Sequence, residues 1–131
     1  MRIHHVAISV KNLEETINFY KEHFGFEEIN TFTKPNWTGE SSIIKLKEMQ
    51  IEAFQFENWK ENRDDMNDKK VIGIKHIAIQ VKSVQEKYEE LKSKGIDIDK
   101  PKKGTTCKMY CFLKDPSGIP LELYEPNQKD F

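Results

Sequence analysis

The sequence contains one strand pattern written twice, IHHVAISV at residues 3–10 and IKHIAIQV at residues 74–81. In both stretches, apolar residues alternate with polar or small ones, which is the period of a β-strand with one buried face. His5 and His76 take the same place in their stretches, on the face opposite the branched apolar residues. The repetition predicts a duplicated fold in which a histidine recurs once in each half.

A helix and three further strands are predicted after the first stretch. Asn12 is a suitable N-cap and Gly25 a suitable C-terminal stop for a helix. Between them, apolar residues recur at helical spacing, at Leu13, Ile17, Tyr20 and Phe24. Alternating segments at 26–33, 42–47 and 50–56 then predict the strands.

The same order follows the second stretch. Ser83 caps a predicted helix that runs through Val84, Tyr88 and Leu91 and ends at Gly95. Strands are predicted near 96–99, at 107–114 and at 120–125, with a turn at 115–118. The sequence therefore predicts an α+β fold of two tandem βαβββ modules, with a mixed sheet curled around a cavity.

These modules are expected to form a single domain over residues 1–131. The first module covers about 1–57 and the second about 73–126. Between them, a charged stretch at about 58–72 has no periodicity and predicts a surface linker.

Composition excludes several classes of function. The chain has 21 basic and 22 acidic residues and a pI near 6.4, so no electrostatic footprint for nucleic acid or an anionic membrane is expected. No apolar run approaches the roughly 20 residues of a membrane-spanning helix, and the N-terminus does not resemble a signal peptide. Cys107 and Cys111 would lie roughly 13 Å apart on a strand, too far for a disulfide. The expected protein is cytoplasmic, with two reduced thiols.

Each module offers one histidine and one carboxylate on the face away from its helix. Glu52 in QIEAFQF shares the parity of Phe54 and Phe56, and Glu122 in LELY shares that of Tyr124. Both the histidines and the glutamates are about 70 positions apart. If the sheet curls around this face, His5, Glu52, His76 and Glu122 form a ligand set for a divalent metal.

A structural alternative stands beside this prediction. A single histidine in a strand is more often hydrogen-bonded than ligating, and a lone glutamate usually faces solvent. His4 has the wrong parity for the site, and His23 falls within the first helix, so neither is assigned to the metal.

Four segments resemble the vicinal oxygen chelate superfamily, also called the glyoxalase, bleomycin resistance protein and dioxygenase group. They are HHVAISVKNLEETINFYKEHFGF (4–26), MQIEAFQFE (49–57), GIKHIAIQV (73–81) and CFLKDPSGIPLELYEP (111–126). The resemblance covers nearly the whole chain and implies the paired βαβββ fold. The closing pattern F-x-x-DP-x-G-x-x-x-EL-x-E is its most specific part.

Within this superfamily, His5, Glu52, His76 and Glu122 match the four ligand positions of glyoxalase I (lactoylglutathione lyase). The resemblance implies one divalent ion, which could be Zn, Ni, Co, Mn or Fe. It also implies a lyase or isomerase acting on a hemithioacetal or another vicinal-oxygen substrate through a metal-stabilised enediolate. Other activities of the superfamily remain open, namely epimerase, thiol transferase or dioxygenase, as does a metal-free resistance protein that binds a small molecule.

The chain departs from glutathione-dependent members of the group. Those enzymes tend to carry an arginine and an asparagine where this chain has Ser9 and Phe56. Arg2 and Arg63 are the only arginines, and a guanidinium is the usual partner of a carboxylate. The resemblance therefore leaves the thiol open and weakens the case for glutathione. Two lysines of the second module, Lys102 and Lys103, could bind an anionic group or could simply be solvated.

The resemblance also assigns roles. Glu122 is expected to be the principal base and Glu52 its pseudo-symmetric partner, while His5 and His76 stay fixed as ligands. A small-molecule substrate would occupy a cavity walled by Phe54, Phe56, Tyr124 and Trp37, whose alternative role is plain core packing. A homodimer is implied, with the site either within one chain or shared across two.

Overall fold

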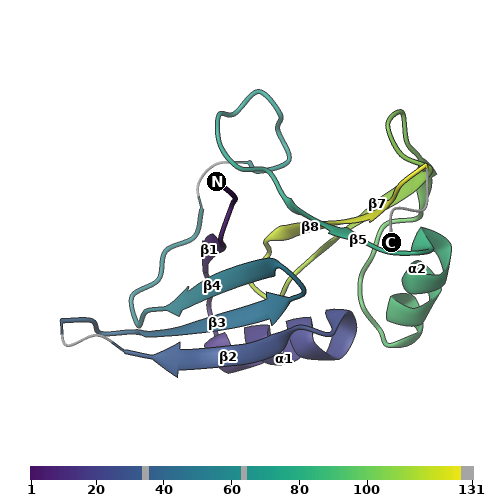
Figure 1. Ribbon diagram of the computed structural model, residues 1–131. Helices are drawn as coiled ribbons and strands as arrows, with labels where there is room; N and C mark the ends of the chain where they lie inside the picture. Colours follow the sequence, from purple (N-terminus) through teal and green to yellow (C-terminus); the bar gives the residue numbers. More distant parts are fainter. Residues whose placement is uncertain (34–35, 63–64, 128–131) are drawn as a thin grey trace. The chain divides into compact units, whose positions relative to one another are not determined.

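A computed structural model describes residues 1–33, 36–62 and 65–127 of the chain (Figure 1). It divides into two compact units, Met1–Glu61 and Asn62–Phe131. Each unit holds one helix and one four-stranded sheet. The units are described in turn.

The first unit has the predicted βαβββ order. Strand β1 (Val6–Ser9) precedes helix α1 (Leu13–Phe24), which is followed by β2 (Glu27–Phe32), β3 (Glu40–Leu46) and β4 (Met49–Gln55). The sheet order is β1-β4-β3-β2. β1 pairs with β4 in parallel and the other neighbours are antiparallel. A register shift in β2, between Glu28 and Asn30, marks a β-bulge on this edge strand.

The second unit repeats this topology. Strand β5 (Ile77–Gln80) precedes helix α2 (Val84–Ser93), and β6 (Lys102–Lys103), β7 (Met109–Lys114) and β8 (Pro120–Glu125) complete the sheet. The order is β5-β8-β7-β6, again with one parallel pair, β5 with β8. The prediction of two βαβββ modules is confirmed, while the curling of the sheets around a common cavity stays a prediction.

Both helices begin at their predicted caps, and α1 also ends where predicted, whereas α2 ends at Ser93, before the predicted Gly95. The side chains of Asn12 and Ser83 accept hydrogen bonds from backbone N–H groups in the first turns of α1 and α2, at 2.8 and 3.2 Å. Helix α1 ends at Gly25, whose φ of 75° is the left-handed conformation that glycine adopts without a steric cost.

The period of two separates the faces of each sheet as predicted. In β4, Ile51 and Ala53 are fully buried, whereas Glu52 and Phe54 between them are partly exposed. In β8, Leu121 and Leu123 are fully buried in the same way. The helices contact β3 and β4 in the first unit and β7 and β8 in the second. Each sheet therefore packs one face under its helix and leaves the face bearing the glutamate open within its own unit.

The last residue of each closing strand caps the helix of its unit. The side-chain oxygen of Gln55 accepts a hydrogen bond from Leu13 N at 2.5 Å. In the second unit, Glu125 Oε2 accepts from Val84 N at 3.0 Å, and its other oxygen pairs with Lys108 Nζ at 2.9 Å. These bonds satisfy N–H groups at the helix N-termini, which have no partner within the helix.

The prediction of a strand near 96–99 is wrong. In its place the structure has a single bridge between Ile98 and Leu113, and the edge strand is the two-residue β6. β1 and β5 are shorter than the predicted 3–10 and 74–81, so His5 and His76 lie just before the paired residues. No helix in the described ranges is long and apolar enough to cross a membrane.

Candidate metal centre

The first unit brings His5 and Glu52 into contact. His5 precedes β1, and Ala7, two residues later on the same face, pairs with Glu52 of β4. This register places His5 Nε2 3.2 Å from Glu52 Oε2. The imidazole is 42% exposed and the carboxylate 18% exposed, so both atoms lie at the surface of the open face.

The second unit brings His76 and Glu122 into the same arrangement. Ala78 of β5 pairs with Glu122 of β8, and His76 Nε2 lies 3.0 Å from Glu122 Oε2. The rings of His76 and Phe112 lie nearly perpendicular, with planes at 78° and centroids 5.2 Å apart. Each unit therefore brings its predicted histidine and its predicted glutamate into contact.

The donor atoms of each pair fit a divalent metal. Ligand atoms about 2.1 Å from one ion, at about 90° to each other, lie about 3.0 Å apart, close to the spacing within each pair. Imidazole nitrogen and carboxylate oxygen are suitable donors for Zn and for the other first-row ions. Within residues 1–33, 36–62 and 65–127, no group of three or more His, Cys, Asp and Glu side chains is arranged to hold a metal. One unit offers one pair, so a four-ligand set needs both units.

His4 contacts His5, although strand parity predicts that the two side chains face opposite sides. Its Nδ1 lies 2.9 Å from Nδ1 of His5, and its Nε2 lies 3.4 Å from Nε2 of Gln50. His23, in contrast, is buried in α1 with its ring against Phe19, which agrees with a packing role.

Three of the predicted cavity residues form a cluster in the first unit. The Trp37 ring lies 5.5 Å from that of Phe54 and 5.6 Å from that of Phe56, centroid to centroid. Gly39 makes this approach possible, because a Cβ there would lie 2.2 Å from the backbone oxygen of Gln55 and 2.8 Å from the Phe56 ring. The cluster flanks Glu52, since Phe54 shares its strand and its face.

The fourth predicted residue, Tyr124, lies on the open face of the second sheet. Its hydroxyl donates to Thr106 O at 3.2 Å, and in register it pairs with Tyr110 of β7. Phe112, the neighbour of Tyr110 on that face, pairs with Glu122. Tyr110 and Phe112 are not among the predicted cavity residues, although their alternation with the buried Cys111 and Leu113 indicates this face.

Both cysteines are free and buried. Burial raises the pKa of Cys111 to about 11, with smaller contributions from Asp99 and Glu122. The pKa of Cys107 is also raised, by burial and by the negative charge of Glu122. These thiols therefore stay protonated near neutral pH, which does not suit a nucleophile.

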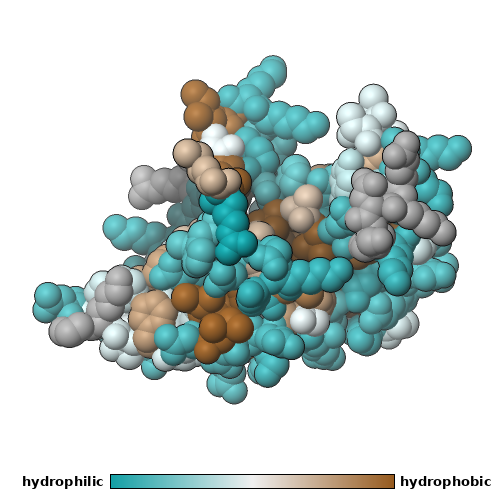
Figure 2. Space-filling view, in the orientation of Figure 1, coloured by the Kyte–Doolittle hydropathy of each residue, from teal (hydrophilic) through white to brown (hydrophobic). Residues whose placement is uncertain are grey.

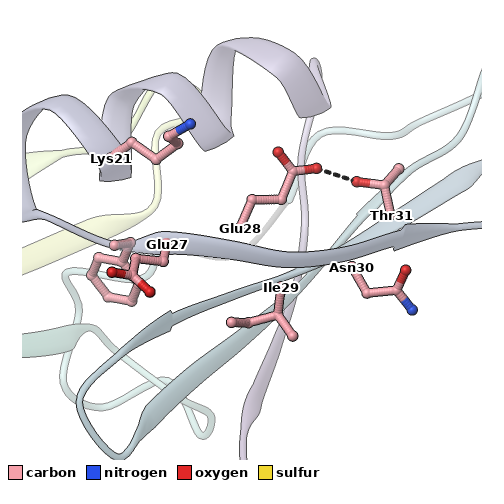
Figure 3. Close-up of a pocket in the computed structure, with 7 residues that line it drawn as sticks. Lys21, Glu27, Glu28, Ile29, Asn30 and Thr31 are labelled. Carbon is pink, nitrogen blue, oxygen red and sulfur yellow. Dashed lines mark hydrogen bonds between the residues drawn. The ribbon is translucent and has the colours of Figure 1, made fainter.

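Two further features, an exposed lysine and a hollow in the first unit, differ in their relation to the candidate site. Lys102 is exposed and pairs with Tyr110, which places it on the edge of the open face of the second sheet. A hollow of about 630 Å³ in the first unit lies between α1 and the edge strand β2 (Figure 3). It is lined by Lys21, Phe26, Glu27, Glu28, Ile29, Asn30 and Thr31. None of the predicted site residues lines it, so it is not assigned to the metal centre.

Comparison with known proteins identifies the family. The model of the Glyoxalase/Bleomycin resistance protein/Dioxygenase superfamily matches residues 2–123. The chain belongs to this superfamily. The match spans both βαβββ units and all four predicted ligands, and it confirms the resemblance drawn from the sequence motifs.

Individual proteins match this chain over nearly their whole length. The uncharacterized protein YwkD of Bacillus subtilis is 30% identical over 125 residues, covering 94% of this chain and 95% of that protein. The lactoylglutathione lyase of Escherichia coli O157:H7 is 26% identical over 132 residues, covering 95% and 93%. The crystal structure of the glyoxalase family protein from Enterococcus faecalis has a TM-score of 0.81 at 30% identity, covering 95% and 97%.

Proposed function

We propose that the protein is a metal-dependent lyase or isomerase of glyoxalase I type. One divalent ion would be held by His5, Glu52, His76 and Glu122, and the substrate would be a hemithioacetal or another compound with two adjacent oxygens. The observation that carries the proposal is the pair of matched imidazole–carboxylate contacts, at 3.2 and 3.0 Å. Similarity to lactoylglutathione lyases over most of both chains supports it.

The two glutamates are suited to moving a proton. When bound, the metal ion would supply positive charge that stabilises the oxyanion left when a proton departs from a carbon next to a carbonyl. Glu122 would remove the proton from the carbon that bears the hydroxyl and return it to the adjacent carbonyl carbon. The hydroxyl proton passes to the former carbonyl oxygen, so the reaction is an isomerisation with no other reactant. Glu52 stands in the equivalent place in the first unit.

The remaining residues would bind the substrate and exclude water. Trp37, Phe54 and Phe56 offer an apolar wall beside Glu52, and Phe112 and Tyr124 offer one beside Glu122. We propose that the protein acts on a small molecule as a cytoplasmic homodimer, as the family resemblance implies. Ser9 and Phe56 leave the glutathione-binding positions without an arginine and an asparagine, so a thiol other than glutathione belongs in the test.

The test is a substrate panel with the metal-loaded protein. Methylglyoxal would be combined with several low-molecular-weight thiols, acyl-CoA epimers would be included, and each of Zn, Ni, Co, Mn and Fe would be tried. Isomerisation would be followed by the absorbance of the thioester product. Activity with at least one thiol is expected. A protein that binds metal but converts no hemithioacetal would contradict the proposed reaction.

The role of Glu122 is tested on the same assay. Glu122→Gln removes the base and is expected to lower kcat by at least about 100-fold, with the circular dichroism spectrum unchanged. Glu125→Gln is the matched control, because Glu125 lies on the same strand but faces α2. Near-normal turnover by Glu122→Gln would exclude this residue as the base.

The aromatic walls also suit a second candidate, a metal-free protein that sequesters an apolar small molecule. Metal analysis separates the two functions. Purified protein that retains no divalent ion after incubation with each metal, yet binds an apolar compound, would favour sequestration.

A further inference from the structure

His4 connects Gln50 of β4 to the predicted ligand His5. The Nδ1 atoms of His4 and His5 are 2.9 Å apart, and Nε2 of His4 lies 3.4 Å from the Gln50 amide nitrogen. The two rings meet edge to face, with centroids 5.2 Å apart and planes at 86°. His5 is thus contacted on both sides, by His4 at Nδ1 and by Glu52 at Nε2.

One placement of protons satisfies all the hydrogen bonds that link Gln50, His4, His5 and Glu52. The Gln50 amide donates to Nε2 of His4, Nδ1–H of His4 donates to Nδ1 of His5, and Nε2–H of His5 donates to Glu52. Because the two facing nitrogens are both Nδ1, one must carry a hydrogen and the other a lone pair. The tautomer of His4 therefore decides the tautomer of His5.

The second unit holds its histidine differently. Lys75 takes the place of His4 in the repeated strand pattern, and the His76 ring packs against Phe112 instead. Duplication alone would have kept the same neighbour in both halves. The contact between His4 and His5 is thus particular to the first unit.

We infer that His4 is a positioning residue, which orients the His5 ring and sets which of its nitrogens is free to bind metal. The inference rests on the proposed function, since it concerns one of the four proposed ligands. Nε2 of His5 faces Glu52 and is the nitrogen available to a shared ion. Ligation through Nε2 needs its lone pair, so the proton must sit on Nδ1 and His4 must accept it.

His4 can serve both states of His5. An imidazole carries one donor and one acceptor, and Gln50 offers either an amide N–H or a carbonyl oxygen to its far side. Partners that hold the second nitrogen of a ligating histidine typically contribute about 10–100-fold in metal affinity. Loss of His4 should therefore weaken the metal site and leave the fold unchanged.

The experiment compares His4→Phe with the unchanged protein by isothermal titration with Zn²⁺ and Co²⁺. Phenylalanine keeps a ring against His5 but offers no hydrogen bond, so the Kd is expected to rise about 10–100-fold. His4→Gln restores a donor and an acceptor and should recover part of the affinity. Lys75→Phe is the matched control in the second unit, and its Kd should not change.

A second readout uses the metal-free protein. Long-range ¹H–¹⁵N spectra of the imidazoles report the tautomer, and His5 should carry its proton on Nε2. In His4→Phe only the contact with Glu52 still favours this tautomer, so the preference should weaken. An unchanged tautomer, or a Kd within twofold of the parent value, would overturn the inference.

These outcomes separate the inference from the proposed function. If the unchanged protein binds no divalent ion, the proposed function fails and His4 has no metal ligand to position. If metal binds, and His5→Ala abolishes binding while His4→Phe does not weaken it, the proposed function stands and the role of His4 is refuted.

Discussion

The cap of helix α2 by Glu125 provides a quantitative test of the fold. Glu125 and Val84 are 7% and 0% exposed, and the carboxylate accepts the Val84 N–H at 3.0 Å. Glu125→Ala leaves that buried N–H without its acceptor, which costs about 1–3 kcal/mol. The ion pair with Lys108, whose side chain is 66% exposed, adds at most about 1 kcal/mol.

The expected loss is therefore about 1–4 kcal/mol in the free energy of unfolding. For a chain of 131 residues this corresponds to a fall in Tm of roughly 4–15 °C. Urea titration and thermal melts followed by circular dichroism measure both quantities. Glu125→Gln is the informative control, because its amide oxygen can still accept from Val84 N, as Gln55 accepts from Leu13 N in the first unit. At pH 7 it should lose less than about 1 kcal/mol.

The difference in stability between the parent protein and Glu125→Gln also depends on pH. The hydrogen bond with Lys108, followed by that with the Val84 N–H, lowers the pKa of Glu125 below its ordinary value of 4.5. A lowered pKa contributes stability above pH 4.5, and this stability is lost as the pH falls through the lower pKa of the folded state. The advantage of the parent protein over Glu125→Gln should shrink in that window. Equal stability of Glu125→Ala and Glu125→Gln at pH 7 would refute the capping role.

Two further predictions concern thiol reactivity and close packing. Because the pKa of Cys111 is raised to about 11 from 9.0, its thiolate fraction near neutral pH is about 100-fold below that of a free thiol. Labelling with a disulfide reagent at pH 7.5 should be slow in the folded protein and fast in urea, and this group's contribution to stability should decline from about pH 9 to 11. Rapid labelling without urea would contradict the burial. Gly39→Ala should destabilise the first unit by about 1–3 kcal/mol in urea titration, because its Cβ would lie 2.2 Å from a backbone oxygen of β4. An unchanged midpoint would show that the loop relaxes freely.

The many polar residues of the chain are reflected in its surface. Hydrophilic side chains cover most of the face seen in Figure 2, in keeping with 33% charged residues. Exposed ion pairs, such as Arg2 with Glu48 at 3.0 Å, contribute little individually. The stability of each unit therefore rests on the apolar face between its helix and its sheet.

The helices, most strands and the shared face of the histidine and the glutamate in each unit followed from the sequence. The reason is that periods of 3.6 and 2 are strict, and caps such as Asn12 and Gly25 act over three or four residues. Once Ala7 pairs with Glu52 and Ala78 with Glu122, parity alone places each histidine on the face of its glutamate. The family motifs gave the same result independently.

What the sequence could not determine depends on contacts between residues distant along the chain. In place of the strand predicted near 96–99, a single bridge joins Ile98 to Leu113 of β7, and Lys102 and Lys103 form the edge strand by pairing with Tyr110 and Met109. Glu125 caps α2 at Val84 although the two residues are 41 positions apart in the sequence, and no local pattern predicts this contact. His4 faces away from the site by parity, yet its ring reaches His5 because the backbone before β1 is not held in a strand. Local periodicity thus determined which residues face the site, and only tertiary packing decided what holds them there.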